Sequence, residues 1–354
     1  MTIPKEIGIL RIKSFRDLIQ DSKAPKRTRL AWIAERAGSF WTFGILFIIV
    51  AVFFVVAPNF HSKAAWVATA LAGTEILLLS IGEGFVMING GIDLSVGANL
   101  GLSGMVSGWV MSKFMVVHSL REFEVVILGL LFAIAVGLSI GLINGLVVTR
   151  LKITPLIATL GMLGAATGVS QLINRGQEIS QLPHEVFQIG ISSVLFGWLP
   201  VPSLVGLILV GICGLLLHKT RFGQHCFAIG SSYEASERSG IKVERHTTKV
   251  YGLAGALAGV AGFLVMAQLG AASITSGQND ELAAITAVVI GGVSIFGGRG
   301  NIAAAVVGTL IITVLQSGLV IAGVNSSWQV ITIGVVLVAA VFLDQQRIRL
   351  SRRT

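Results

Sequence analysis

The sequence predicts an all-α integral membrane protein with about ten transmembrane helices, some of them broken or re-entrant. Of its 354 residues, 54% are hydrophobic and only 12% are charged, a composition far from that of a soluble globular domain. Its 43 glycines suit helices that approach one another closely in lipid. Together with the long apolar runs that recur after residue 40, these observations predict a polytopic membrane protein.

Ten apolar segments define the predicted helices. Several are shorter than the roughly 20 residues that a perpendicular crossing needs, and the weakest, 283–296, either spans or re-enters. With the N-terminus inside, 22 of the 26 Lys and Arg residues fall on the inner side, as the positive-inside rule requires. Both termini are therefore predicted to be cytoplasmic. The segments are 41–57, 65–88, 94–111, 124–148, 154–174, 203–218, 250–269, 283–296, 302–322 and 328–343.

The chain is expected to have three parts: a basic tail over 1–40, a transmembrane domain over 41–343 and a basic tail over 344–354. The first tail is either an amphipathic helix on the inner membrane surface or a loose segment whose charges fix orientation. The net charge of +9 does not indicate a nucleic-acid partner, because the basic residues cluster between apolar spans. The two cysteines offer no disulfide framework.

Residues 86–104 interrupt the apolar pattern with a polar, glycine-rich stretch. In hydrocarbon, such a break leaves backbone groups unpaired unless protein or a wet cavity surrounds it. Transporters often build binding sites from half-helices that meet at such breaks. We expect Asn89, Asp93 and Ser95 to line a substrate path. The alternative for Asp93 is structural, as an N-cap that satisfies the first N–H groups of the next helix.

Two glutamates lie within the apolar segment before the break. Ionisable residues in a span usually face a cavity or a partner. Glu75 either lines the path or hydrogen-bonds a neighbouring helix, and Glu83 either lines the path or reaches water near the inner end. Asp280 and Glu281 either cap the helix that follows them or meet an outer partner.

No catalytic or metal-binding pattern is present in the sequence. There is no Gly-x-x-x-x-Gly-Lys-Ser/Thr phosphate loop, no His-Glu-x-x-His and no Gly-x-Ser-x-Gly nucleophile elbow, and the six His are dispersed. We therefore predict a protein that is not an enzyme and holds no cofactor or metal. If transport is powered by ATP, a partner must bind the ATP and Mg²⁺.

Four ordered motifs resemble those of the membrane permeases of ribose-type ABC sugar importers. The resemblance covers about 86–344 and is specific for the family rather than for one substrate. The motifs are Gly90-Gly91-Ile92-Asp93-Leu94-Ser95-Val96-Gly97, Thr154-Pro155-Leu156-Ile157-Ala158-Thr159-Leu160-Gly161, Thr220-Arg221-Phe222-Gly223 with Ala228-Ile229-Gly230 and Ser239-Gly240-Ile241, and Ala287-Val288-Val289-Ile290-Gly291-Gly292 with Gly297-Gly298-Arg299-Gly300.

The resemblance implies a multi-pass permease in the bacterial inner membrane, with a fold like that of the vitamin B12 importer. It also implies partners: two cytoplasmic ATPase subunits, a periplasmic sugar-binding protein and a second permease, identical or related. Gln224 and Ser231-Ser232 depart from the usual pattern, as does Glu237-Arg238. These departures lie where an ATPase would dock, and so they bear on the partner's identity.

The inner loop 218–249 is the expected contact for that ATPase. Its middle is predicted to be a short helix, with Ser231 or Ser232 as N-cap and Gly240 as its end. The resemblance implies a coupling helix, whereas an ordinary basic loop would also obey the topology rule. The residues assigned to coupling are Tyr233, Glu234, Ala235, Ser236, Glu237, Arg238, Ser239 and Gly240.

The predicted function is therefore the permease of an ATP-driven monosaccharide importer. The cargo within that class could also be a nucleoside, a polyol or a sugar-like signal. From a different class, an ion-coupled secondary transporter could use Glu75 or Asp93 as a proton site. Dependence of uptake on a separate ATPase distinguishes the two classes.

Overall fold

The computed structural model describes residues 29–117 and 121–351, in a chain that divides into one unit over 1–41 and a second over 42–354. The part of the basic tail predicted as an interfacial helix lies outside the described residues. The elements are α2 (Arg29–Val56), α3 (Lys63–Ile88), α4 (Val96–Val117), α5 (Glu122–Arg150), α6 (Pro155–Ile173), α7 (His184–Ile191), β1 (Ser193–Val194), β2 (Leu199–Pro200), α8 (Val201–Lys219), α9 (Arg221–Ser231), α10 (Tyr233–Arg238), α11 (Val243–Leu269), α12 (Asp280–Gly291), α13 (Ile302–Ile321) and α14 (Ser326–Ser351).

Each of the ten predicted apolar segments coincides with a helix of the structure. Among the described residues, six helices are long and apolar enough to cross a membrane: α3, α5, α6, α8, α11 and α13. Helix α12 has only 12 residues, or about 18 Å at the helical rise, which is well short of the ~30 Å hydrocarbon layer. Of the two alternatives for 283–296, re-entry fits this length better than a full span, because the helix ends at Gly291 and the chain is irregular from there to Asn301.

The central helix of the second unit is α11, which packs against α3, α4 and α5. Glycines make this packing possible: a β-carbon on Gly137 of α5 would overlap the carbonyl oxygen of Gly255 on α11, and the reverse is also true. One turn further along α11, Gly259 meets the carbonyl of Ala133 in the same way. Because any side chain here would separate the two backbones, the glycines at this contact are explained by close helix packing.

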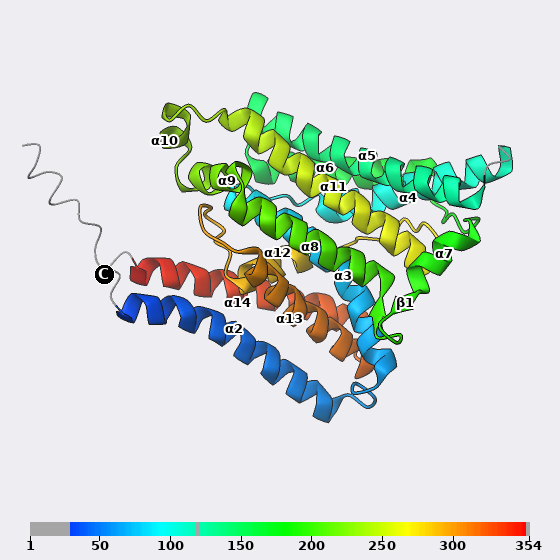
Figure 1. Cartoon of the computed structure of the whole chain (residues 1–354), viewed down its shortest axis with the longest axis horizontal. Helices are drawn as coiled ribbons and strands as arrows, with labels where there is room; N and C mark the ends of the chain where they lie inside the picture. Colours follow the sequence, from blue (N-terminus) through cyan, green and yellow to red (C-terminus); the bar gives the residue numbers. More distant parts are fainter. Residues whose placement is uncertain (1–28, 118–120, 352–354) are drawn as a thin grey trace, which may run out of the picture. The chain divides into compact units, whose positions relative to one another are not determined.

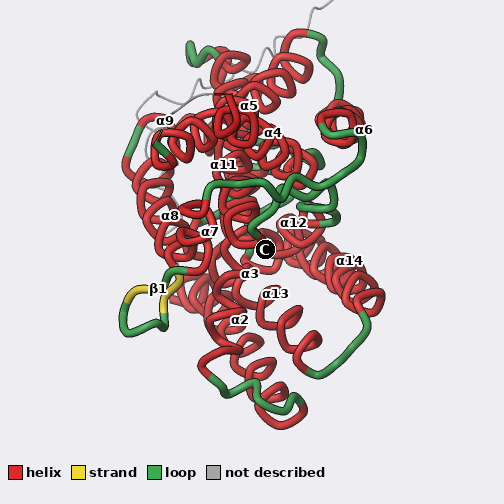
Figure 2. The backbone as a smooth tube through the Cα atoms, turned by 90° about the vertical axis from the view of Figure 1, so that its right-hand side faces the viewer, coloured by secondary structure: helices red, strands yellow, loops and turns green. Residues whose placement is uncertain are grey.

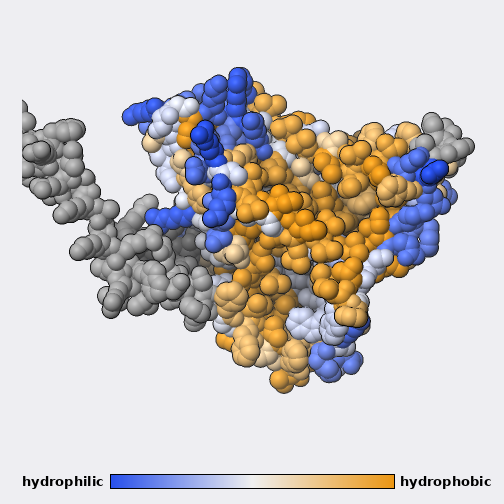
Figure 3. Space-filling view, viewed as in Figure 1, coloured by the Kyte–Doolittle hydropathy of each residue, from blue (hydrophilic) through white to orange (hydrophobic). Residues whose placement is uncertain are grey.

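The surface of the described part is divided by polarity. Figure 3 shows a broad band of hydrophobic side chains with hydrophilic ones gathered at its two ends. In Figure 1 the short helices α9 and α10 lie at one end of the long helices, and α7 with the β1–β2 hairpin lies at the other. This distribution is that of a multi-pass membrane protein whose helices meet lipid along their length.

Some elements differ from the predicted pattern. The α7 helix, the hairpin and α9 fall in stretches expected to be loops, and α14 continues to Ser351 through most of the predicted C-terminal tail. Helix α9 is amphipathic, with Gly223, Cys226 and Ile229 on its buried side, so a search for long apolar runs does not find it.

Candidate functional site

The break after α3 is real and short. Helix α3 ends at Ile88, Gly90 adopts a left-handed conformation with φ +92°, and α4 begins at Val96. The N–H of Gly91 returns to the carbonyl of Val86 at 2.9 Å, which turns the chain back along α3. A β-carbon on Gly91 would lie 2.5 Å from the Tyr251 hydroxyl oxygen of α11, so the turn also needs glycine for space. Residues 89–95, called the break from here on, are therefore shaped by both backbone conformation and close packing.

Asp93 is the centre of a buried polar network. Its backbone N–H donates to both carboxylate oxygens of Glu83 on α3, at 3.1 and 3.2 Å. Its Oδ1 accepts from the backbone N–H of Ser95 at 2.9 Å and from the Ser95 hydroxyl at 2.6 Å. Asn144 Nδ2 of α5 donates to Ser95 Oγ at 2.8 Å and lies 3.4 Å from each Asp93 carboxylate oxygen. The network joins the break to α3 and α5.

The same network bears on the alternative that Asp93 acts as a helix N-cap. The Ser95 carbonyl accepts the first helical bond of α4, from Asn99 N–H at 2.8 Å, so Ser95 stands at the start of the helix. Asp93 satisfies the Ser95 N–H just before that start, which is close to the capping role considered from the sequence. Asp93 and Ser95 are 1% and 0% exposed within this chain, so their side chains face its interior.

Two further helices hold the break. Thr159 Oγ1 of α6 accepts the Leu94 N–H at 3.1 Å, and Asn89 Nδ2 donates to Thr247 Oγ1 of α11 at 3.0 Å. The Tyr251 hydroxyl, also on α11, lies 3.4 Å from the carbonyl oxygen of Ile92. The break thus has side-chain partners on α3, α5, α6 and α11. Sequence reasoning placed Asn89, Asp93 and Ser95 together but did not identify Thr159, Thr247 or Tyr251 as their partners.

The two glutamates of α3 have different surroundings. Glu83 is 0% exposed, and its carboxylate accepts the Asp93 N–H. The alternative that Glu83 reaches water is therefore wrong within this chain. Glu75, two turns earlier, is half-buried and interacts electrostatically with Asp280 at the start of α12. Asp280 and Glu281 lie in the first helical turn, where the helix dipole favours negative charge. The structure therefore groups Glu75 with α12 rather than with the break.

On the side that faces α9, the break meets glycines from two distant segments. Gly230, near the end of α9, packs so closely that a β-carbon there would overlap the Ile88 carbonyl oxygen and lie 2.5 Å from the Gly298 nitrogen. A β-carbon on Gly297 would lie 3.0 Å from the Gly90 Cα and 2.8 Å from the Gly230 carbonyl oxygen. The Gly298 N–H donates to the Ile88 carbonyl at 2.9 Å. We call Gly90, Gly230, Gly297 and Gly298 the glycine junction.

Each of the four sequence motifs contributes to this one place. The first supplies the break itself and the second supplies Thr159 of α6. The third supplies Gly230 and the fourth supplies Gly297 and Gly298. Residues more than 200 positions apart in the chain are brought into backbone contact here. The motif order indicated that these stretches matter, but their convergence could be seen only in the structure.

The predicted helix of the inner loop is present as α10. Ser232 Oγ accepts the Ala235 N–H at 3.3 Å as its N-cap, and Gly240 follows it with φ +85°. Within Tyr233–Gly240 only Ser236 is buried, so the helix offers an almost free surface. Partial burial and the carboxylates of Glu237 and Glu244 raise the pKa of the Tyr233 phenol, so it stays a neutral hydrogen-bond donor. Helix α10 follows α9 directly, and α9 ends in the glycine junction.

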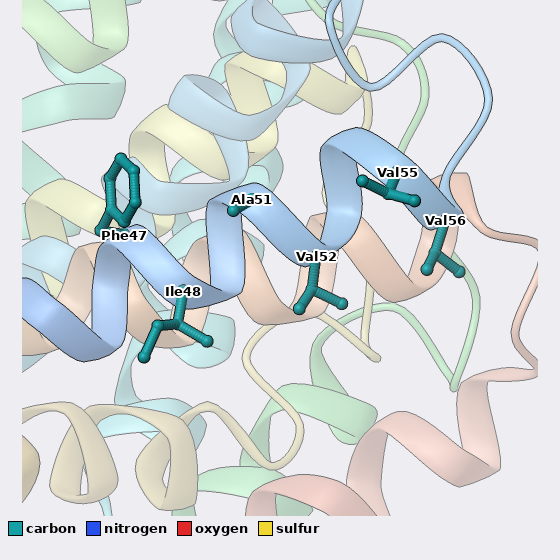
Figure 4. Close-up of a pocket in the computed structure, with 6 residues that line it drawn as sticks. All are labelled: Phe47, Ile48, Ala51, Val52, Val55 and Val56. Carbon is teal, nitrogen blue, oxygen red and sulfur yellow. The ribbon is translucent and has the colours of Figure 1, made fainter.

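Two hollows are open at the surface of the described part. One, of about 410 Å³, is wholly apolar and lies along α2, where Figure 4 shows its six residues on one face of the helix: Phe47, Ile48, Ala51, Val52, Val55 and Val56. The other, of about 470 Å³, is polar and lies between the ends of α4 and α6, with Trp109, Lys113 and Arg175 among its lining residues. Among the described residues, no group of three or more His, Cys, Asp and Glu is placed to hold a metal ion.

Comparison with known proteins adds a family to this geometry. A family described as the permease component of the branched-chain amino acid transport system matches residues 66–341. The ribose import permease protein of Bacillus subtilis is 37% identical over 325 residues, covering 91% of this chain and 96% of the relative. The D-allose transport system permease protein of Escherichia coli is 33% identical over 311 residues, covering 86% and 92%.

A third relative has a different sugar in its name. The galactose/methyl galactoside import permease protein of Salmonella typhimurium is 30% identical over 330 residues, covering 90% of this chain and 96% of the relative. No solved structure matches the chain.

Proposed function

The chain belongs to the family of permease components of branched-chain amino acid transport systems, and from this premise we propose that it is the membrane permease of an ATP-driven monosaccharide importer. The relatives that cover nearly its whole length are named for ribose, allose and galactose, which favours a monosaccharide over an amino acid as cargo. The four motifs that carry the resemblance are also the segments that meet at the break. A shared fold alone would not require that convergence.

The glycine junction is the observation that carries this proposal. It lies only a few residues along the chain from α10, whose exposed surface would face a cytoplasmic partner. A movement of α10 therefore acts on the end of α3 and on the break through backbone contacts, with no flexible side chain between them. Such rigid contact suits a subunit in which a conformational change of the ATPase partner must switch the substrate path between its two sides.

The partners follow from this role. Two cytoplasmic ATPase subunits would bind ATP and Mg²⁺ and engage Tyr233–Gly240, and a periplasmic binding protein would deliver the sugar. A second permease, identical or related, would complete the path, as the resemblance to permeases of ABC sugar importers implies. The proposed setting is the bacterial inner membrane, with ten spans, both termini inside and the vitamin B12 importer type of fold.

Uptake measured with and without the partners tests the proposal. Cells that express this chain with its ATPase and binding protein are offered ribose, allose, galactose and, as comparisons, a nucleoside, a polyol and a branched-chain amino acid. We expect uptake of one monosaccharide that disappears when the ATPase is removed. Uptake that persists without the ATPase and follows the proton gradient would replace this function with ion-coupled transport. Uptake of only the amino acid would contradict the choice of cargo.

A further inference from the structure

The hairpin between α7 and α8 has a strained and exposed apolar tip. Strands Ser193–Val194 and Leu199–Pro200 pair in antiparallel register and leave a four-residue loop. Leu195 and Phe196 both have left-handed backbones, with φ +51° and +57°. The Gly197 N–H returns to the Val194 carbonyl at 3.1 Å, so these two residues stand at the centre of a tight turn with positive φ at both positions. Asn and Gly are the residues that such turns favour.

Leu and Phe are unfavourable in that conformation, so their presence suggests that their side chains make a contact of their own. Bulky residues with positive φ are genuine outliers, and strain of this kind persists where function needs it. Within the chain these side chains gain little, since Leu195 is 66% and Phe196 is 98% exposed. Trp198 beside them is 55% exposed. The turn therefore keeps its apolar side chains outside the protein, at the cost of backbone strain.

The hairpin is held firmly in that position. Lys63, the first residue of α3, donates from Nζ to the Phe196 carbonyl at 2.8 Å and lies 5.7 Å from the centre of the Trp198 ring. The chain after the hairpin enters α8 at once, at Val201, and the Val201 N–H bonds the Ser192 carbonyl at 2.8 Å. The tip is thus level with the ends of two membrane-spanning helices.

The direction of the tip points to lipid. Figure 2 looks at the end of the bundle that carries the hairpin, and it shows the hairpin projecting sideways from the rim of the helices rather than over their middle. The tip residues Leu195, Phe196 and Trp198 carry no charge, and the Lys63 ammonium beside them is directed at the backbone and at the indole ring. Tryptophan with lysine at the end of a span is the usual composition of the membrane–water interface.

We propose that Leu195, Phe196 and Trp198 form a lipid anchor that inserts into the interfacial layer of the outer leaflet and fixes the outer ends of α3 and α8 relative to the bilayer. The anchor rests on the membrane topology of the proposed function. Its test requires neither transport nor the partner proteins, so that failure of the anchor and failure of the transport function remain separate results.

Fluorescence quenching measures the position of the tip. The chain has only two cysteines, Cys213 and Cys226, and both are buried, so a Phe196→Cys variant of the full chain takes a fluorescent label at one exposed site. The variant is placed in nanodiscs of phosphatidylcholine and phosphatidylglycerol, with brominated acyl chains as lipid quenchers and iodide as the aqueous quencher. Asn59→Cys is the matched control, because Asn59 is polar, exposed and also left-handed, in the loop between α2 and α3.

We expect brominated lipid to quench the label at 196 several-fold more than the label at 59, and iodide to show the opposite order. Equal access of iodide to both labels would overturn the anchor. A label at 196 that neither quencher reaches would also overturn it, and would assign the tip to a contact with a second chain.

A double substitution in one variant distinguishes anchoring in lipid from ordinary packing within the chain. Leu195→Asn with Phe196→Gly supplies residues that tolerate positive φ. We expect this pair to raise the thermal unfolding midpoint in detergent and, in nanodiscs, to reduce lipid quenching of a label at Trp198→Cys to the level seen at Asn59→Cys. A lowered midpoint would show that the two side chains stabilise the chain itself and would overturn the anchor.

Discussion

The two sides of the break are held by opposite means. On the side that faces α9, Gly90, Gly230, Gly297 and Gly298 bring backbones together with no side chains between them. On the other side, Glu83, Asp93, Ser95 and Asn144 join three parts of the chain through buried polar side chains. Backbone contact leaves no room for adjustment, whereas a hydrogen-bond network depends on chemical type and tolerates a partner of the same shape. The difference predicts which substitutions each side can accept.

The largest expected effect on uptake comes from removing α10, the helix that follows the glycine junction. Replacing Glu234–Gly240 with a Gly/Ser linker removes α10 while disturbing only Ser236 among buried side chains. We expect sugar uptake to be abolished, with membrane insertion and the thermal unfolding midpoint unchanged, because the junction would no longer receive the partner's movement. Uptake assays and membrane fractionation of the same cells measure both. Unchanged uptake would show that coupling passes elsewhere.

A single methyl group should break the junction itself. In Gly230→Ala the new β-carbon overlaps the Ile88 carbonyl, and overpacking of this kind typically costs about 1–3 kcal/mol and occasionally more. We therefore expect a loss of thermal stability together with a loss of uptake. Gly214→Ala on α8 is the matched control, since no atom lies within 4 Å of its added β-carbon and alanine favours a helix. Equal behaviour of the two variants would contradict the close contact.

The polar side of the break should distinguish shape from chemistry. Asp93→Leu leaves the Ser95 N–H and hydroxyl without their acceptor, at roughly 1–3 kcal/mol for each buried group, whereas Asp93→Asn keeps an oxygen in place. We expect the Leu variant to be clearly destabilised and the Asn variant to stay close to the parent in thermal unfolding. Similar losses in both would mean that the negative charge of Asp93, rather than its oxygen, holds the network.

The sequence predicted the elements of this site much better than their contacts. Glycine and aspartate within an apolar run identified the break, and apolar runs identified ten of the helices that the structure describes, the short α12 among them. The partners of the break could not be read in the same way, because they come from three different helices. The second motif contains Thr159 but does not show what it contacts, and nothing local distinguishes Asn144 and Thr247 from other polar residues in spans. The hairpin was missed because its tip residues, Leu195 and Phe196, are not those that signal a tight turn.

The smallest expected effect tests whether the two sides act as one structure. Asn89 lies between them, next to Gly90, and donates to Thr247 at 3.0 Å. Asn89→Ala and Thr247→Val should each cost about 1 kcal/mol of unfolding free energy, and the double variant should cost little more than either alone, as expected for one shared hydrogen bond. Additive losses would show that the bond contributes nothing. In a chain that already carries Gly230→Ala, Asn89→Ala should add little further loss of unfolding free energy. The reason is that the Asn89–Thr247 hydrogen bond needs Ile88 and Gly90 to keep Asn89 against α11, and Gly230→Ala displaces that part of the chain.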